Sequence, residues 1–284
     1  MPKVLSLNVT DGGRRVQTLV ADALGSLAPD LATLQEVRTD TVASWRSAVE
    51  REGFHVADTF DLARQHDVPD PSRFRTDGLL ITSRWPLQAL APTRWDLPWP
   101  ERLLSARVDH PRGPIELHTA HVPNASTGIT LYRKGEHERG RERLMKKLET
   151  FEGVYRALTA SPTAARILTG DFNTPHSERP DGSVGYWQHS CPAALRPELA
   201  QRWNAAERSV IEGLREHGFA DAYRTLHGPN TDAFSWEHGS SGNRYRYDHV
   251  FASTELTPTA SDYLHEFRLN SSHHAAILTD LAWA

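Results

Sequence analysis

Cysteine is nearly absent from this sequence, which has one, Cys191, among its 284 residues. A single cysteine excludes an internal disulfide framework and fits a reducing compartment. No apolar run approaches the length that crosses a bilayer, and the first residues enter a strand-like pattern without the apolar core of a signal peptide. We therefore expect a cytoplasmic protein with no membrane span.

A positive excess is also lacking, because 32 lysines and arginines stand against 36 aspartates and glutamates, for a formal net charge of −4. Domains that coat nucleic acid through bulk electrostatics usually carry a strong positive excess. The balance argues against that class, although basic residues do concentrate between Arg133 and Lys147. Glutamates interleave with them, so the stretch predicts either a solvated helix face with i,i+4 ion pairs or a rim that contacts phosphates.

Linkers, repeats and low-complexity tracts are missing as well. The chain is long enough for one large two-layer core or two small domains. With no proline-rich or serine-rich boundary in the sequence, we expect a single domain over residues 1–284 and a monomer. A hydrophobic share of 38% with eight tryptophans indicates a globular fold.

Strand-like and helix-like patterns alternate in each half of the chain. The strands are expected at Val4–Asn8, Leu31–Val37, Gly78–Thr82, Leu104–Val108, Ile115–His121, Ile167–Asn173, Tyr247–Ala252 and Ala276–Leu281, and the helices at Val16–Leu27, Trp45–Arg51, Tyr132–Leu158 and Trp203–His217. This alternation is typical of an α/β protein whose sheets are covered by helices.

The most informative segment runs from Ile167 to Pro175 and reads Ile-Leu-Thr-Gly-Asp-Phe-Asn-Thr-Pro. On an extended backbone, residues two apart project from the same side. Asp171 and Asn173 should therefore point together beyond the strand end, while Phe172 turns back into the core. The proline places the pair where the strand passes into a loop. An Asp-x-Asn pair alone is equally compatible with an ordinary turn.

Polar residues stand at the ends or entries of several predicted buried strands. They are Asn8, Glu36, His121, Asp171, Asn173, Asp248 and the pair His273–His274. Each alone has an ordinary structural explanation, such as a turn cap or a satisfied core histidine. Burying many carboxylates and imidazoles is costly, however, unless they share a site. We therefore expect one polar site at the strand ends.

Taken together, these motifs resemble those of the endonuclease/exonuclease/phosphatase superfamily, whose members are metal-dependent phosphoesterases. The matching segments, in the family's order, are Leu7–Val9, Leu34–Glu36, His118–Asn124, Gly170–Asn173, Arg246–Phe251 and Ser272–His274. The branch of exonuclease III and the abasic endonucleases is the most similar. The resemblance implies a four-layer α/β sandwich, in which two mixed β-sheets pack face to face between flanking helices.

The resemblance also implies a metal and a nucleophile site. A phosphodiester repels an anionic nucleophile, so a divalent cation must neutralise it, and hard oxygen ligands suit Mg²⁺ or Mn²⁺. Glu36 would be the principal ligand, with Asn8 beside it in the metal site. Asp171 and Asn173 match the pair that orients and activates the attacking water.

Three further residues match catalytic positions of the family. His274 and Asp248 match a histidine–carboxylate dyad, in which the carboxylate raises the basicity of the imidazole and fixes its tautomer. His121 matches a residue that donates a hydrogen bond to a phosphate oxygen. The family pattern leaves open whether the histidine of the dyad or Asp171 is the general base.

The sequence departs from the family at its last motif, which is Ser-Asp-His elsewhere and Ser272-His273-His274 here. We align His274 as the catalytic histidine, because Ile277 then takes the apolar strand position, and we assign His273 to the metal site. The alternative register makes His273 catalytic and Ser272 the replaced aspartate. Either way an anionic ligand is lost, which either tilts the site toward Mn²⁺ or leaves one metal held by fewer protein ligands. A non-catalytic member is a further alternative, disfavoured because the other motif residues are present.

The substrate is expected to be engaged by Asn124, Arg246 and Trp236. Exposed aromatic residues can stack on bases or sugars, although a core tryptophan is equally compatible with Trp236. We expect a phosphodiester hydrolase acting on DNA, as an endonuclease or 3′ exonuclease of repair type. The alternative is a phosphatase or phosphodiesterase for a small molecule or lipid headgroup, because the centre sets the phosphate chemistry but not the leaving group. The loops around the site should distinguish the two substrates. A positively charged groove across them favours DNA, and a closed pocket favours a small substrate.

Overall fold

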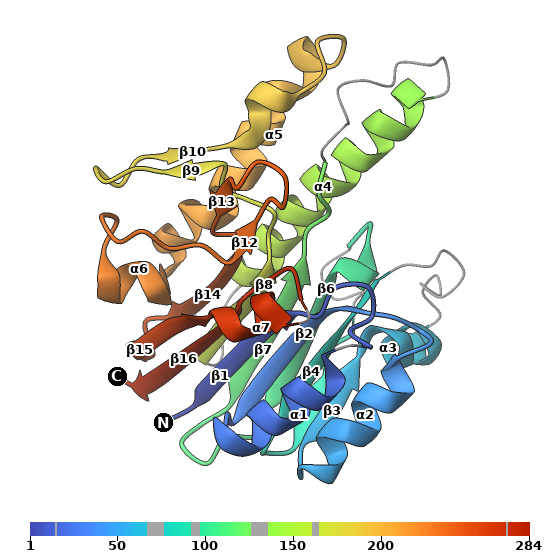
Figure 1. Cartoon of the computed structure of the whole chain (residues 1–284), viewed down its shortest axis with the longest axis vertical. Helices are drawn as coiled ribbons and strands as arrows, with labels where there is room; N and C mark the ends of the chain where they lie inside the picture. Colours follow the sequence, from blue (N-terminus) through green and yellow to red (C-terminus); the bar gives the residue numbers. More distant parts are fainter. Residues whose placement is uncertain (15, 67–76, 92–96, 126–135, 161–164, 271) are drawn as a thin grey trace.

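Two six-stranded mixed sheets pack face to face, and helices cover the outer face of each (Figure 1). The computed structural model describes residues 1–14, 16–66, 77–91, 97–125, 136–160, 165–270 and 272–284. The four layers confirm the α/β sandwich that the sequence resemblance implied.

Sheet 1 contains, in spatial order, β15 (Leu256–Leu264), β16 (Ala276–Trp283), β1 (Lys3–Asn8), β2 (Leu31–Val37), β4 (Gly78–Ser83) and β3 (His55–Asp58). Sheet 2 contains β11 (Phe219–Asp221), β14 (Asp248–Ser253), β8 (Ala165–Asp171), β7 (Ile115–His121), β6 (Leu103–Val108) and β5 (Leu87–Ala89). Two short hairpins pair β9 (Ser177–Glu178) with β10 (Val184–Gly185) and β12 (Trp236–Glu237) with β13 (Arg244–Tyr245).

The helices are α1 (Gln17–Ser26), α2 (Val42–Arg51), α3 (Thr59–His66), α4 (Glu136–Thr159), α5 (Arg196–Ile211), α6 (Ala222–His227) and α7 (His265–Asn270). Short 3₁₀ helices are η3 (Pro100–Arg102), η4 (Trp187–Ser190) and η5 (Gly213–His217). In the part of the chain that the structure describes, no helix combines the length and the apolar composition needed to cross a bilayer.

Each sheet has one parallel pair of strands at its centre, β1 with β2 and β7 with β8. Parallel neighbours need a crossover connection, which contains α1 in the first case and α4 in the second. The carboxyl ends of parallel strands meet at one edge of a sheet, and β1 and β2 contact β8 and β7 of the opposite sheet. The polar residues that end these four strands are thereby brought together.

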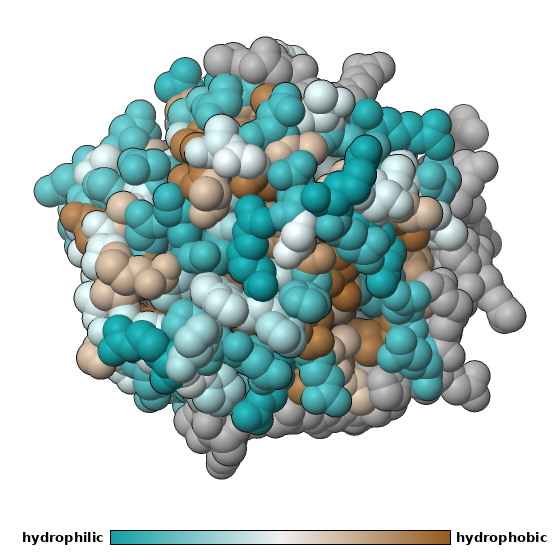
Figure 2. All heavy atoms as spheres, turned by 90° about the horizontal axis from the view of Figure 1, so that it is seen from below, coloured by the Kyte–Doolittle hydropathy of each residue, from teal (hydrophilic) through white to brown (hydrophobic). Residues whose placement is uncertain are grey.

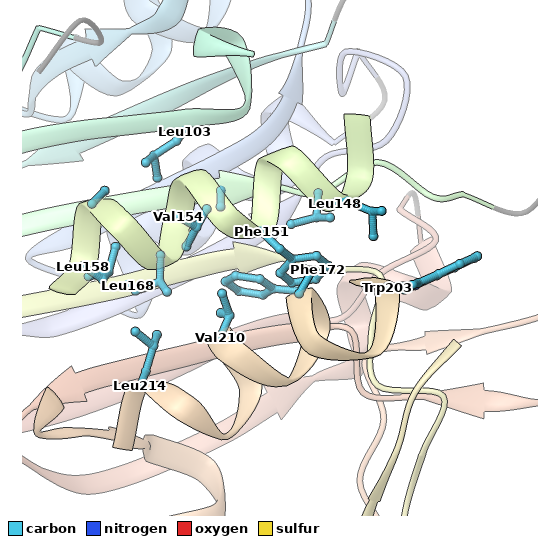
Figure 3. Packing of buried hydrophobic residues seen from close by; sticks show 14 of the residues in the cluster. Leu103, Leu148, Phe151, Val154, Leu158, Leu168, Phe172, Trp203, Val210 and Leu214 are labelled. Atoms are coloured by element: carbon cyan, nitrogen blue, oxygen red, sulfur yellow. The ribbon is translucent and has the colours of Figure 1, made fainter. Parts of the chain in front are cut away.

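Three apolar clusters fill the spaces between the layers. One lies between the two sheets, and another lies between sheet 1 and the helices α1 and α2. The third joins sheet 2 to α4 and α5 (Figure 3). Phe172 belongs to this third cluster, with its ring centroid 6.4 Å from that of Phe151 on α4. The predicted inward turn of Phe172 is therefore confirmed.

Several predicted boundaries are wrong at their ends. The strand expected over Ile167–Asn173 stops at Asp171, and the helix expected from Trp203 begins at Arg196, with a proline in its first turn. The described part of α4 runs from Glu136 to Thr159, and residues 132–135 of the predicted helix lie outside the described residues. The edge strand β15 has no counterpart among the predicted strands. It contains Pro258 and alternates with exposed polar residues, so its sequence lacks a buried apolar run.

The surface is polar where it can be followed. Figure 2 views the molecule from below Figure 1, and among the residues coloured there hydrophilic side chains predominate, with small apolar areas between them. Of the large apolar side chains that the structure describes, only Met1 and Leu226 are exposed.

Candidate active site

A cavity of about 360 Å³ opens where the ends of β1, β2, β7 and β8 meet. Its lining residues are Thr10, Glu36, Asp77, Arg102, His121, Pro123, Asn124, Asp171, Asn173, Trp236, Tyr247, His273 and His274. Most of the residues that the sequence predicted for the site are among them. Asn8 and Asp248 are fully buried and bonded to lining residues, whereas Arg246 lies elsewhere.

The backbone at the site adopts unusual conformations. Glu36 and Asn173 have positive φ angles of 62° and 47°, and Thr10 and Asp11 are also left-handed. Such conformations are costly for residues other than glycine and persist where the surrounding structure holds them. The pairing of β2 with β4 shifts register between Gln35 and Val37. This bulge turns Glu36 toward the cavity, as bulges commonly do beside active sites.

Asp171 and Asn173 do meet, but not on an extended backbone as the sequence suggested. The chain turns after Asp171, and the backbone N–H of Asn173 donates to Asp171 Oδ1 at 2.9 Å. The Asn173 carboxamide donates to Asp171 Oδ2 at 3.3 Å and to the carbonyl of Val122 at 3.0 Å. Gly170 precedes this turn with a φ of 141°, and a Cβ there would lie 2.0 Å from the carbonyl oxygen of Ala120. Only glycine fits so close to the neighbouring strand.

Asn8 joins the two carboxylates that face the cavity. Its Nδ2 donates to Glu36 Oε1 at 3.0 Å and to Asp171 Oδ2 at 2.9 Å, and its Oδ1 accepts from the backbone N–H of Thr10 at 2.9 Å. The carboxamide thus holds Glu36 and Asp171 at a set separation. Asn8 thus lies beside Glu36 as expected, and its place in the metal site stays a prediction.

His274 lies between two carboxylates. Its Nδ1 is 2.8 Å from Asp248 Oδ2, and its Nε2 is 3.8 Å from Asp171 Oδ2. Burial alone would lower the pKa of His274, but the charges of Asp248 and Asp171 outweigh it and raise the pKa to about 9. Burial also raises the pKa of Asp171, to about 7, against the opposing charge of His274. Near neutral pH the arrangement therefore pairs a protonated imidazole with a carboxylate that is close to its titration point.

His121 is a neutral hydrogen-bond donor. Burial first, and then the charge of Arg102, lower the pKa of His121 to about 3. Arg102 Nη1 lies 3.1 Å from His121 Nδ1, and a guanidinium can only donate. The imidazole proton must therefore sit on Nε2, which lies 3.7 Å from Glu36 Oε1 and 4.0 Å from Asp171 Oδ2.

Among the lining residues that the sequence did not single out are Arg102 and Asp77. Arg102 belongs to none of the matching motifs, although it ends the loop before the strand predicted at Leu104–Val108. Asp77 precedes β4 and accepts a hydrogen bond from Arg38 Nε at 2.7 Å. The only available signal was the position of each residue next to a predicted buried strand, which does not separate a lining residue from an ordinary loop residue.

The structure distinguishes the two registers of the last motif. His274 bonds Asp248, whereas His273 is exposed, lines the cavity and donates its backbone N–H to Thr10 Oγ1 at 3.3 Å. Ser272 is buried, with its hydroxyl donating to the carbonyl of Asn8 at 2.7 Å and accepting from the backbone N–H of His274 at 3.0 Å. The alignment with His274 as the dyad histidine matches these contacts.

Arg246 is not brought to the cavity, contrary to our expectation that it binds substrate. Its guanidinium is buried, with Nη2 lying 2.7 Å from Glu178 Oε1 and 2.8 Å from Asp221 Oδ2. Burial opposes ionisation of Glu178, but the charge and hydrogen bonds of Arg246 and of Arg224 lower its pKa to about 2. Arg246 lines a second cavity, of about 300 Å³, in which both arginines are paired with acids.

Aromatic rings form one wall of the catalytic cavity. Trp236 is half-buried and stacks on Tyr247 with ring centroids 5.6 Å apart, and Tyr247 stacks on Tyr245 at 5.1 Å. Trp236 therefore lines the cavity and is not enclosed in a core. Asn124, also predicted to contact substrate, is exposed on the same cavity.

The basic stretch is largely neutralised where the structure describes it. Arg141 pairs with Glu198, Lys146 pairs with Glu101, and Lys147 is buried against Glu207. Arg133 and Lys134 lie outside the described residues. These three pairs join α4 to other segments and are not the i,i+4 pairs of a solvated face that the sequence suggested, and they leave little free positive charge for a phosphate rim.

The residues at the cavity fit a hard divalent cation. Glu36 has a carboxylate that is 20% exposed on the wall, next to Asp171 and across a shared Asn8 amide. Oxygen donors of this kind suit Mg²⁺ and Mn²⁺. Asp171, Asp248 and His274 also place possible ligand atoms within 4.8 Å of one another. We consider this second group a proton network, because Asp248 Oδ2 and His274 Nδ1 already bind each other.

Comparison with known proteins agrees with this arrangement. A family model described as the Endonuclease/Exonuclease/phosphatase family matches residues 7–273. The chain is similar to an AP endonuclease from Archaeoglobus fulgidus, with a TM-score of 0.68, 19% identity and 99% of each chain covered. It is also similar to the 3′ phosphatase NExo from Neisseria bound to a product DNA hairpin, with a TM-score of 0.65, 17% identity and 100% of each chain covered.

A third similar structure is D. rerio TDP2 complexed with a single-strand DNA product, with a TM-score of 0.60, 14% identity, and coverage of 99% of this chain and 98% of that one. At these identities the likeness establishes the fold. Among curated proteins no sequence matches the chain.

Proposed function

Because the chain belongs to the endonuclease/exonuclease/phosphatase family, whose members are metal-dependent phosphoesterases, we propose that it hydrolyses phosphodiester bonds in DNA. The observation that carries this proposal is the meeting of Glu36, Asp171 and the Asp248–His274 pair on one cavity. Repair-type action, as an endonuclease or 3′ exonuclease, is the form of the reaction that we favour. The DNA products named for two of the similar structures support it.

Glu36 would hold the divalent cation, Mg²⁺ or Mn²⁺, with His273 and Asp171 at the same cavity. When bound, the cation neutralises the phosphate and stabilises the leaving oxygen. His273 stands where the family has an aspartate, so this site carries less negative charge. Less charge should weaken Mg²⁺ binding more than binding of the borderline ion Mn²⁺.

Asp171 is the general base that the geometry favours. Its Oδ2 faces Nε2 of His274 at 3.8 Å, and burial raises its pKa to about 7, whereas the charges of Asp248 and Asp171 raise the pKa of His274 to about 9 against burial. Asp171 Oδ2, held by Asn8 and Asn173, accepts the proton of the attacking water as the water oxygen bonds to phosphorus. The bond from phosphorus to the leaving oxygen then breaks, and that oxygen takes up a proton from solvent water.

The two histidines stabilise charge on the phosphate oxygens in different ways. His274, fixed by Asp248, supplies a positive charge, and His121 supplies a neutral Nε2–H donor. Donors that are already oriented are worth most where charge develops in the transition state. Trp236 and Tyr247 would contact the sugar or base beside the phosphate.

A small phosphoester is the second candidate substrate. The net charge of −4 and the acid-paired basic residues of α4 favour it over an extended DNA contact. The same centre would serve both substrates, since the residues described above act on the attacking water and the phosphate oxygens and not on the leaving group.

An activity panel tests the proposal. Purified protein with Mg²⁺ or Mn²⁺ is offered an abasic-site duplex, a plasmid, bis-p-nitrophenyl phosphate and inositol phosphates, with the Asp171→Asn variant as the control for contaminating nucleases. We expect metal-dependent cleavage of the DNA substrates that is lost in the variant. Turnover of only inositol phosphates would move the assignment to the second candidate. Failure to hydrolyse any phosphoester with either ion would contradict the proposal.

We further propose that the protein works as a cytoplasmic monomer with one domain over residues 1–284. The single cysteine, Cys191, is buried, which fits a compartment where disulfides are not required. Light scattering coupled to size exclusion tests the monomer, and localisation of a tagged chain tests the compartment.

A further inference from the structure

A buried ion pair lies between the outer helices α4 and α5. It lies behind the loop that follows β8 and contains Asn173, which we call the catalytic loop. Lys147 on α4 has its Nζ 2.8 Å from Oε1 of Glu207 on α5, and the side chains are 2% and 0% exposed. Figure 3 shows these two helices packed side by side over sheet 2. A buried ion pair is weak evidence of stabilisation, because desolvation offsets its attraction. The pair therefore calls for an explanation beyond helix packing.

The ammonium group of Lys147 also contacts the catalytic loop. Lys147 Nζ donates to the carbonyl oxygen of Asn173 at 3.0 Å. The second oxygen of Glu207 accepts the backbone N–H of Trp187 at 2.8 Å, so the counterion is itself held in place. Lys147 is not among the residues that line the catalytic cavity. It therefore acts on the loop from behind and does not touch the substrate.

Asn173 needs such support because of its backbone. Its φ of 47° is left-handed, and this conformation aims its carboxamide at Asp171 and Val122. The next carbonyl, that of Thr174, accepts from His249 Nε2 at 3.1 Å. The carbonyls of Asn173 and Thr174, which follow β8, thus both accept hydrogen bonds from buried side chains.

We propose that Lys147 is a positioning residue for Asn173. Its ammonium group, fixed by Glu207, holds the Asn173 carbonyl and keeps the carboxamide in contact with Asp171. An apolar side chain would fill the same space among Phe151 and Trp203 but would leave the carbonyl without its donor. The proposal rests on the proposed function, in which Asp171 accepts the proton of the attacking water.

The test separates positioning from stability. In the double variant Lys147→Met/Glu207→Leu, removal of both buried charges partly offsets the hydrogen bonds lost by Asn173 and Trp187, so the melting temperature should fall less than in the control below. We expect kcat for the best phosphoester of the panel to fall by about 10²-fold, as for a small displacement of a catalytic group, with little change in KM. The matched control is Arg166→Met, which removes a buried cation at the other end of β8 that donates to the carbonyl of Leu158. It should lower the melting temperature and leave kcat unchanged.

Hydrogen exchange of the backbone amides of residues 172–174 provides a readout that needs no activity. Exchange there should rise in the double variant and not in Arg166→Met. The milder Glu207→Gln, which keeps the lysine, should give a smaller rise and serves if the double variant does not fold. Parental kcat together with parental exchange in the Lys147 and Glu207 variants would overturn the inference. A parent that hydrolyses no phosphoester would instead contradict the proposed function, and the exchange data would still decide on Lys147.

Discussion

The carboxylate of Asp248 lies 2.8 Å from Nδ1 of His274, and this hydrogen bond joins the two sheets at the site. Asp248 begins β14 in sheet 2, whereas His274 precedes β16 in sheet 1. An ionised carboxylate can only accept, so Nδ1 carries a proton and Nε2 is turned toward Asp171 at 3.8 Å. The pair sets both the orientation and the charge of His274.

We predict that Glu36→Gln and Asp171→Asn each abolish turnover while the fold remains intact. Both residues lie at strand ends beside the cavity, where removing a charge relieves burial cost. The expected loss in kcat is on the order of 10³-fold or more, as for groups that act on the metal or the nucleophile. Steady-state kinetics on variants with matched circular dichroism measures it. Activity within about tenfold of the parent for either variant would place the centre elsewhere.

The pH profile of kcat/KM should have two limbs. The pKa of Asp171 is raised to about 7 by burial, and that of His274 to about 9 by the charges of Asp248 and Asp171 against burial. Asp171 must lose its proton to act as a base, so activity rises with pH through its pKa. A bound cation lowers that pKa, so the acid limb should lie at or below about 7. His274 must keep its proton, so activity falls as pH rises through about 9.

The variant Asp248→Asn assigns the alkaline limb. Removing the carboxylate withdraws the main charge that raises the pKa of His274, so the alkaline limb should move to lower pH. The acid limb should move in the same direction but by less, because burial is the main cause of the raised pKa of Asp171 and the charge of Asp248 is a smaller one. An alkaline limb that stays in place in this variant would show that His274 does not titrate there.

Metal preference should depend on His273. The parent is expected to prefer Mn²⁺ over Mg²⁺, and His273→Asp should shift the preference toward Mg²⁺, because it restores a hard anionic ligand. Activity and direct calorimetric binding of each ion measure the shift. His274→Ala is the contrasting variant, and it should destroy activity with both ions. An active His274→Ala together with an inactive His273→Asp would mean that His273 is the catalytic histidine.

DNA binding should have a shallow salt dependence. The net charge is −4, and Arg141, Lys146 and Lys147 of α4 are paired with acids. The slope of log K against log salt should therefore correspond to roughly two to four phosphates, at about 0.9 per contact. Fluorescence anisotropy with a labelled abasic duplex measures this slope. A steep slope like that of a large repressor would contradict local engagement.

Charge reversal at Arg133 and Lys134, which lie outside the described residues, examines the same surface. The change should weaken DNA binding without altering which lesion or end is cleaved, because phosphate contacts position the substrate and do not specify it. A change in the cleaved position would indicate a contact that reads the lesion itself.

Local patterns were sufficient to find the strands that carry the site. The bounds of β2 and β7 were predicted without error, because a buried strand leaves a short apolar run that ends at a polar residue. The same signal singled out Glu36 and Asp171, since an acid directly after such a run must either be solvated or share a site. Those features depend on neighbours in the chain, and the sequence alone determined them.

Other features depend on contacts between distant segments. The left-handed backbone of Glu36 follows from the register shift against β4, and the tautomer of His121 follows from the guanidinium of Arg102. Arg246 lies away from the cavity because it pairs with Glu178 and Asp221, which are distant from it in the sequence. Lys147 lies in a basic helical stretch that reads as solvated, yet it is buried behind the catalytic loop. Only the tertiary structure decided these, because the partner of a polar side chain is chosen by long-range packing, which strand and helix periodicity does not encode.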